Sequence, residues 1–222
     1  MIFNNSISNL LDITGFTFSG SPYSFSYTVG DLDCSDIETI TINIDEGPES
    51  GTANVPANFC QGLAPENYDL FDLLTGADQL GTWFIGTDNS GAITTNPIDI
   101  SGLAEGTYNY TYEVTPIGTC VDEPVTVQII VNPLPNTGTP SGAIFCENDL
   151  IANSPLDLFG QLSGNELGGT WADDNSTGAL TGSNVDITGL AVGSYNFTYS
   201  ITTLDGCSNS STVVITIEPA PE

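Results

Sequence analysis

The chain has 222 residues, of which 28 are Asp or Glu and none is Lys, Arg or His, so its formal net charge is −28. Without cationic side chains it cannot neutralise phosphates, which excludes nucleic-acid binding, and its catalytic repertoire is restricted to carboxylates, thiols, hydroxyls and phenols. Hydrophobic residues make up 39% of the sequence, which is enough for packed cores. No apolar run approaches the roughly 18 residues of a membrane span, so direct membrane insertion is not expected.

An alternating aromatic segment occurs three times along the chain. Residues 21–29 read SPYSFSYTV, residues 106–114 read GTYNYTYEV and residues 193–201 read GSYNFTYSI. Aromatic residues at every second position have the period of a β-strand with one buried face. We therefore expect the same strand in three copies.

A second motif gives the length of the repeat. The sequence DI(T/S)G begins at Asp12, Asp99 and Asp186, so successive copies lie 87 residues apart. A solenoid turn takes roughly 20 to 50 residues, whereas a period of this size suits one small domain. The chain is expected to be a row of domains: a first repeat at 1–48, a second at 49–135 and a third at 136–222.

The first repeat contains only the back half of the pattern, including expected strands at 23–29 and 39–44. Such a remnant has one apolar face and cannot close its own core, so we expect the sequence to be an excerpt of a longer protein. The alternative is that another chain donates the missing strands.

The second and third repeats are expected to be all-β. In the second repeat the alternating runs lie between Gly, Pro, Asp and Asn turn signals and predict strands at 52–59, 68–74, 81–85, 92–100, 107–115 and 125–131. The linker NPLPNTG at 132–138 contains two prolines, which favour an extended, semi-rigid connection. Neighbouring repeats should therefore be strung in line.

The five cysteines are expected to form disulfides within repeats. Cys60 and Cys120 lie 60 residues apart, Cys146 and Cys207 lie 61 apart, and each pair brackets most of one repeat. These spacings predict the bonds Cys60–Cys120 and Cys146–Cys207 and leave Cys34 as an orphan whose partner would lie upstream. Disulfides are typical of extracellular proteins, whereas the lack of His and of CxxC disfavours a metal site.

Two acidic turns are candidate calcium sites. Asp88 lies in TDNSG, and Asp173 and Asp174 lie in ADDNSTG. Clustered oxygens suit calcium, but Asp and Asn also occur in turns because they bond to the local backbone, and both interpretations stay open. No other cofactor is expected.

The remaining side chains do not indicate an enzyme. The carboxylates are scattered through turns and show no cleft-forming insertion, such as the paired acids of a glycosidase would need. The aromatic stripes could stack on sugars, but strict alternation beside an apolar final strand favours core packing.

Two features resemble immunoglobulin-like domains. LAEGTYNYTYEV and LAVGSYNFTYSI are similar to the tyrosine-corner region of that fold, with Tyr108 and Tyr195 in the matching places. Trp83 and Trp171, each in a GTW motif, resemble its buried tryptophan. The resemblance implies an all-β fold of tandem immunoglobulin-like β-sandwich domains strung in line, the first one incomplete, with these four residues in the cores.

The whole chain resembles the tandem repeats of very large secreted adhesins of gliding Bacteroidetes, the SprB-type gliding adhesins. The resemblance rests on the period, the acidic composition, the order FC, GTW, DI(T/S)GL, G(T/S)Y, C and the PLPNTG linker. It implies type IX secretion, an extracellular location on the bacterial surface and a filament that attaches to surface polysaccharide or a solid substratum, with neighbouring repeats as its partners. The alternatives are a carbohydrate-binding or accessory module of a secreted polysaccharide-degrading enzyme and a strand-donating fibre subunit.

Overall fold

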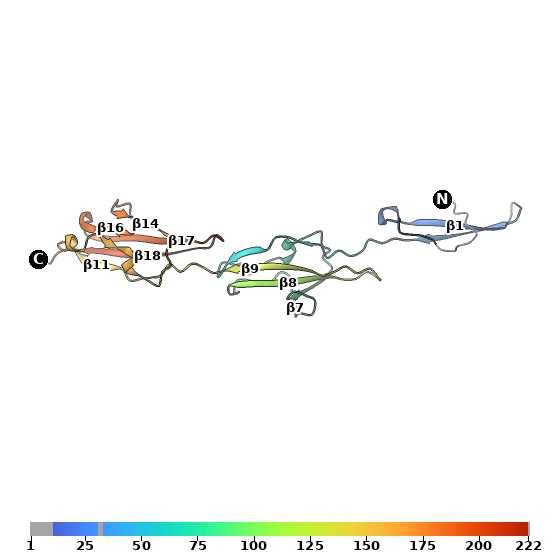
Figure 1. The fold of residues 1–222 in the computed structure, drawn as a ribbon, viewed down its shortest axis with the longest axis horizontal. Coiled ribbons are helices and arrows are strands. Elements are labelled where there is room, and N and C mark those ends of the chain that lie inside the picture. Colours follow the sequence, from blue (N-terminus) through green and yellow to red (C-terminus); the bar gives the residue numbers. More distant parts are fainter. Residues whose placement is uncertain (1–10, 31–32, 222) are drawn as a thin grey trace.

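The computed structural model describes residues 11–30 and 33–221. In this part of the chain all regular elements are β-strands or 3-10 helices of three or four residues. Figure 1 shows the strands in three groups that follow one another along the long axis of the molecule. Within the described ranges no helix has the length and hydropathy needed to cross a bilayer.

The elements of each repeat are as follows. The first repeat contains η1 (Phe18–Gly20), β1 (Tyr23–Gly30) and β2 (Ser35–Ile42). The second contains β3 (Thr52–Ala53), β4 (Ala57–Cys60), η2 (Leu70–Leu73), β5 (Leu74–Thr75), β6 (Gly81–Ile85), β7 (Ile93–Thr94), β8 (Gly106–Val114) and β9 (Val125–Asn132). The third contains β10 (Thr139–Pro140), β11 (Ala143–Cys146), η3 (Leu150–Asn153), β12 (Leu156–Asp157), η4 (Leu158–Gln161), β13 (Leu162–Ser163), β14 (Thr170–Asp173), β15 (Leu180–Thr181), β16 (Asn184–Val185), η5 (Ile187–Gly189), β17 (Gly193–Thr202) and β18 (Ser208–Glu218).

The second repeat is a sandwich built on one large sheet. Its strands follow the order β4-β9-β8-β6-β7, with β4 parallel to β9 and the other neighbours antiparallel. Val127, Ile129 and Val131 alternate along β9 and are buried, as β-branched residues on the inner face of a strand should be. The opposite layer is made of the short β3–β5 pair and a bridge between Tyr68 and Ile98. The core lies between the two layers.

The third repeat has the same plan. Its main sheet has the order β11-β18-β17-β14, and β11 again runs parallel to the last strand, β18. Two smaller sheets, β10-β13 and β12-β16-β15, cover it. Phe197 and Tyr199 of β17 and Ile215 and Ile217 of β18 alternate into a second, separate core. The prediction of tandem immunoglobulin-like β-sandwiches is confirmed.

Two of the strands that the sequence predicts, 68–74 and 92–100, form only in small part. Residues 70–73 form a 3-10 turn, and between 92 and 100 only two residues pair as a strand beside a single bridge. The Asp69 side chain accepts the Phe71 N–H, and the Asn96 side chain accepts the Leu70 N–H at 2.7 Å. These side chains satisfy backbone donors that a neighbouring strand would otherwise satisfy.

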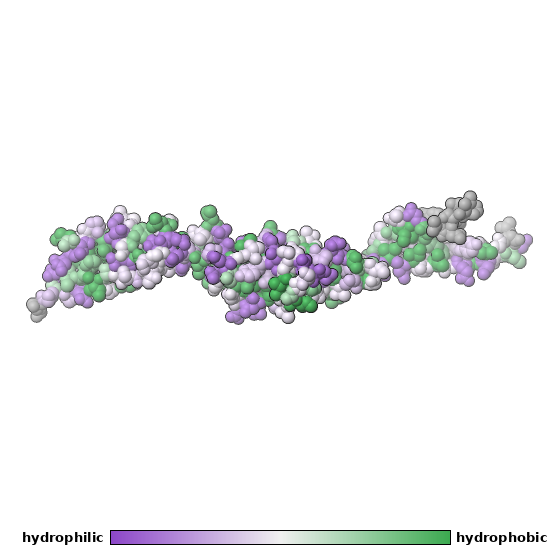
Figure 2. Space-filling view, turned by 60° about the horizontal axis from the view of Figure 1, so that its bottom comes forward, coloured by the Kyte–Doolittle hydropathy of each residue, from purple (hydrophilic) through white to green (hydrophobic). Residues whose placement is uncertain are grey.

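The first repeat is represented by the β1–β2 hairpin. The two strands pair from Tyr23 opposite Ile42 to Gly30 opposite Ser35, and no residue of either strand is buried. Tyr27 is 70% exposed, and hydrophobic side chains are visible on the surface of this unit in Figure 2. The hairpin has no second layer among the described residues, in contrast to the sandwiches beside it.

Candidate functional site: the junction between two repeats

A disulfide joins the second repeat to the third. Cys60 and Cys207 are bonded across a sequence separation of 147, with their Cα atoms 5.5 Å apart. Cys60 is the last residue of β4 and lies opposite Asn132, the last residue of β9. Cys207 lies in the turn between β17 and β18 and is fully buried. The bond therefore connects the C-terminal end of one sandwich to the N-terminal end of the next.

The predicted bonds Cys60–Cys120 and Cys146–Cys207 are wrong. Because β4 runs parallel to β9, Cys60 lies where β9 ends, whereas Cys120 precedes the start of β9. The strand from Val125 to Asn132 spans roughly 23 Å, whereas the two Cα atoms of a disulfide lie within about 7 Å. Cys146, opposite Glu218 at the end of β18, is separated from Cys207 in the same way.

Hydrogen bonds hold the linker that leads into the third repeat. The Asn209 amide donates to the Pro135 carbonyl at 3.0 Å, and the hydroxyls of Thr137 and Ser211 are 2.8 Å apart. Thr137 is only 2% exposed, and Ser211 also donates to the Gly138 carbonyl at 2.8 Å. The start of β18 thus binds the linker beside the disulfide.

The linker into the second repeat is held at equivalent positions. Asp122, two residues after Cys120, accepts the Ser50 N–H at 2.6 Å, and this bond holds the pKa of Asp122 below its ordinary value. Asp78 accepts the Glu49 N–H at 3.0 Å. The hairpin that follows the aromatic strand therefore contacts the incoming chain in both repeats.

A glycine is required at the same point of each linker. Gly51 and Gly138 have φ angles of +84° and +82°, in the left-handed region that side chains disfavour. A Cβ at Gly51 would lie 2.8 Å from the Ala77 Cβ, and one at Gly138 would lie 2.9 Å from the Asn165 Cβ. The chain thus enters both sandwiches along the same path.

The tyrosine hydroxyls fix the loop before the aromatic strand. Tyr108 donates to the Ala104 carbonyl and Tyr195 to the Ala191 carbonyl, both at 3.0 Å and both four residues back. Tyr23 instead donates six residues back, to the Thr17 carbonyl at 3.1 Å. The inserted turn η1 accounts for the longer reach in the first repeat.

The two tryptophans belong to matching aromatic clusters. Trp83 is 4% exposed and lies 5.5 Å from Phe71 and 4.9 Å from Tyr112, measured between ring centroids. Trp171 has the same two neighbours in the third repeat, Phe159 at 5.6 Å and Tyr199 at 5.1 Å. Trp83 is thus a core residue, as predicted, whereas Trp171 is only partly buried and packs against the core of the third repeat. The contacts between the rings favour a packing role for both tryptophans.

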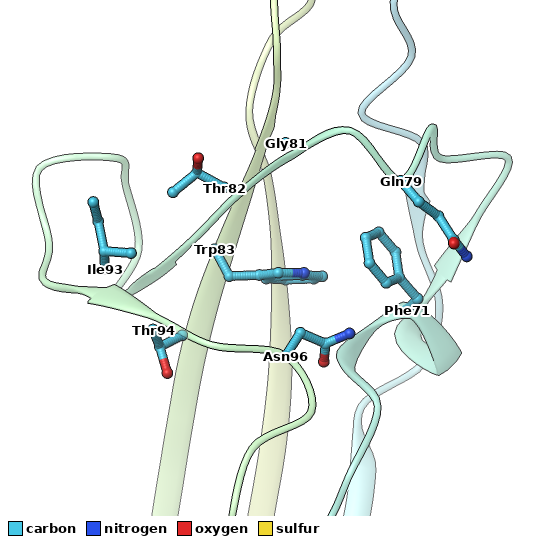
Figure 3. A pocket seen from close by; sticks show the side chains of 8 residues that line it. All are labelled: Phe71, Gln79, Gly81, Thr82, Trp83, Ile93, Thr94 and Asn96. Carbon is cyan, nitrogen blue, oxygen red and sulfur yellow. The ribbon is translucent and has the colours of Figure 1, made fainter.

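A hollow of about 350 Å³ lies beside Trp83 (Figure 3). Its other lining residues come from the segment around η2 and from β6, β7 and the loop after β7: Phe71, Gln79, Gly81, Thr82, Ile93, Thr94 and Asn96. None of them carries an acid, a base or a thiol. Asn96 is already engaged with the backbone of Leu70 and the carboxylate of Asp69. The reactive groups of its lining are therefore limited to the hydroxyls of Thr82 and Thr94.

The acidic turns use most of their carboxylate oxygens internally, but Asp173 Oδ1 is buried without a hydrogen-bond partner. Asp88 accepts both the N–H and the hydroxyl of Ser90, at 2.9 and 2.6 Å, and these bonds, the hydroxyl's foremost, lower its pKa. Asp173 accepts the Thr177 hydroxyl at 2.8 Å, and Asp174 accepts the Thr198 hydroxyl at 2.6 Å. Among the described residues no three His, Cys, Asp or Glu side chains are grouped to hold a metal. Calcium at Asp88, Asp173 and Asp174 stays a prediction.

The comparisons with known proteins find only distant structural similarity. Neither a family model nor a curated protein matches the chain. Among solved structures, hemolin, an insect immune protein described with implications for homophilic adhesion, is 13% identical over 89% of this chain, with a TM-score of 0.36. Protocadherin gamma C5 is also 13% identical, over 90% of this chain and 78% of its own, with a TM-score of 0.33.

A bacterial structure matches as well. SGBP-B of the mixed-linkage glucan utilization locus of Bacteroides ovatus, solved with a mixed-linkage heptasaccharide, is 17% identical over 79% of this chain and 45% of its own, with a TM-score of 0.24. The chain spans about half the length of the hemolin structure, 56% of it. At these TM-scores the functions of the matched proteins carry no argument for this chain.

Proposed function

We propose that the chain is a structural segment of the stalk of a secreted cell-surface adhesin. The repeats at 1–48, 49–135 and 136–222 would hold the adhesive part of the protein away from the cell and contribute to attachment. The observation that supports this most directly is the bond between Cys60 and Cys207, because it fixes the end of one sandwich to the start of the next. A stalk needs such a fixed connection, and a compact catalytic domain does not.

The same bond supports an extracellular location, since disulfides persist in oxidising compartments and are rare in reducing ones. The described residues have no helix suited to membrane insertion, and the hollow beside Trp83 has no ionisable lining. These features suit a role in spacing and attachment.

The net negative charge of the chain would keep neighbouring filaments apart. A formal charge of −28 without any cationic side chain makes neighbouring stalks repel one another. Attachment would then require a neutral surface, a cationic one, or divalent ions between two anionic ones. We propose surface polysaccharide or a solid substratum as the contact, in a gliding adhesin exported by the type IX system.

The location is tested on intact cells of the source organism with antibodies raised against residues 49–222. Gold-labelled antibodies in negative-stain images should mark thin filaments that extend from the cell, and treatment of whole cells with a protease should remove the label. Labelling that appears only after lysis, or on compact particles, would overturn the proposal.

The gliding role is tested separately with a strain that lacks the gene. The strain should lose attachment to glass and movement over it, while its secretion of other proteins stays intact. Normal movement in that strain would remove the gliding assignment and leave the stalk assignment to the labelling experiment.

A further inference from the structure

Cys146 occupies the same structural position in the third repeat that Cys60 occupies in the second. Cys60 is the last residue of β4 and lies opposite Asn132 of β9. Cys146 is the last residue of β11 and lies opposite Glu218 of β18. In both repeats the residue after the cysteine donates its N–H to the carbonyl of that opposite residue, at 2.8 Å from Gln61 and 2.9 Å from Glu147. The two thiol positions are therefore built by the same hydrogen bonds.

Cys120 and Cys207 are likewise equivalent. Each lies in the turn between the aromatic strand and the final strand, and each turn is closed by backbone bonds, between Ile117 and Cys120 and from Thr203 to Cys207. Two residues after each cysteine, Asp122 or Asn209 binds the linker that enters the repeat. Both turns thus face the preceding repeat.

Of these two pairs of equivalent positions, one member of each pair is bonded: Cys60 and Cys207 face each other across a junction. Cys120 and Cys146 are thiols, the first exposed and the second partly exposed. Each lies at the end of its repeat that points away from the bonded junction. Because the repeats are built alike, the disulfide at one junction indicates that the equivalent cysteines form disulfides at other junctions.

The linker sequence allows the same geometry at the next junction. Asn132 is followed by Pro-Leu-Pro, and its equivalent Glu218 is followed by Pro-Ala-Pro. With the prolines at the same spacing, a repeat that followed residue 222 would place its turn cysteine beside Cys146 as the third repeat places Cys207 beside Cys60.

We propose that Cys146 and Cys120 are two halves of a recurring inter-repeat disulfide, with like repeats in series as their partners. Cys146 bonds the turn cysteine of a repeat that follows, and Cys120 bonds the strand-end cysteine of one that precedes. This inference rests on the proposed stalk function and specifies how the repeats of such a stalk are joined.

The bond forms by thiol–disulfide exchange with a disulfide oxidant such as glutathione disulfide. One protein thiolate attacks the oxidant and displaces a glutathione thiolate, and the second protein thiolate then displaces the other from the mixed disulfide. Two protein thiols are oxidised, one oxidant disulfide is reduced, and two glutathione thiols take up the two protons. Cys120 and Cys146 are accessible to this chemistry because neither is buried.

The test for Cys146 is an extended chain in which residues 1–222 are followed by a second copy of 137–222, so that Glu222 stands in the place of Asn136. After oxidation with glutathione disulfide and cleavage before aspartate, residues 122–148 carry the first Cys146, and the final peptide, 205–222 of the added copy, carries the added Cys207. Mass mapping should find these two peptides bonded and the Cys60–Cys207 bond retained. A bond between the added Cys207 and the Cys146 of its own repeat, or a first Cys146 left as a thiol, would overturn the proposal.

The matched control is Cys146→Ser in the first copy, which leaves that repeat's core untouched. The added Cys207 should then remain a thiol, whereas its bonding within its own repeat would contradict the geometry.

Cys120 is tested in a chain of residues 1–135 joined to 49–222, with Cys120→Ser in the first copy. The first Cys60 should bond the second Cys120, and a second Cys120 that stays reduced would overturn this half of the proposal. These results depend only on the fold, so they are independent of where the protein is located in the cell.

Discussion

At the scale of single residues, the recurring aspartate of DI(T/S)G has a structural role. Asp12, Asp99 and Asp186 each accept the N–H of the residue two positions on, at 3.0 Å, and its hydroxyl, at 2.6 to 2.8 Å. A short side-chain acceptor of this kind closes a turn without a strand partner. The motif is therefore explained by backbone hydrogen bonding and needs no bound ion.

These bonds predict how acid affects the third repeat. The Thr188 hydroxyl, then the Thr188 N–H and the Ser154 hydroxyl, lower the pKa of Asp186 from its ordinary 3.8. Since the folded state holds the proton less tightly, the stabilisation is complete above about pH 4 and is lost as the pH falls through the folded pKa. An NMR titration of the carboxyl carbon should give a midpoint below 3.8, and Thr188→Val should raise it. A midpoint at or above 3.8 in the native chain would contradict this assignment.

At the scale of elements, the same hairpin exists in two environments. The β1–β2 and β8–β9 pairs have similar lengths, but β8 and β9 bury Tyr110, Tyr112, Val127, Ile129 and Val131, whereas no residue of β1 or β2 is more than partly buried. An isolated two-stranded hairpin is marginally stable in water, because its hydrogen bonds lack the support of a packed face. The two pairs should therefore differ greatly in local stability.

Hydrogen exchange of the full chain tests this difference. Amides of β1–β2 should exchange at least roughly 100-fold faster than those of β8–β9, since a hairpin with few buried contacts opens locally. Mass spectrometry after peptic digestion resolves the two pairs, and β17–β18 serves as a second internal reference. Equal protection of β1–β2 would mean that another chain or segment covers its apolar face, as strand donation requires.

The sequence was sufficient for the sandwich fold but not for the cysteine pairing. Alternation identified β6, β8 and β9 closely, because long half-buried strands have a clear period. It failed at 68–74 and 92–100, where Asp69 and Asn96 replace strand partners. The spacing of Cys60 and Cys120 located both in one repeat but did not reveal that β4 lies parallel to β9, which places them at opposite ends.

At the scale of the whole molecule, the junction between the second and third repeats combines a covalent bond with linker contacts. The disulfide fixes Cys60 to Cys207, and Asn209 and Ser211 bind the linker at Pro135 and Gly138. Each of these hydrogen bonds makes only a small net contribution to stability, about 1 kcal/mol. The disulfide should therefore dominate the fixed orientation of the two sandwiches.

The double substitution Cys60→Ser and Cys207→Ser tests this expectation. Both cores should stay folded, but 15N relaxation should show the two repeats tumbling separately, whereas in the native chain they tumble together. Cys146→Ser is the matched control and should leave the tumbling unchanged. Joint tumbling in the double variant would show that the linker contacts alone set the orientation.

The placement of that bond also determines how far the molecule can lengthen under load. Tension applied through β4 passes through the disulfide directly to β18. The chain between the two cysteines then carries no load. The sequence separation of 147 between the two cysteines, at about 3.5 Å per residue, represents roughly 500 Å of contour length that unfolding cannot release. In an oxidising medium this part of the chain therefore cannot lengthen under tension. Reduction of the disulfide would allow it to unfold and extend.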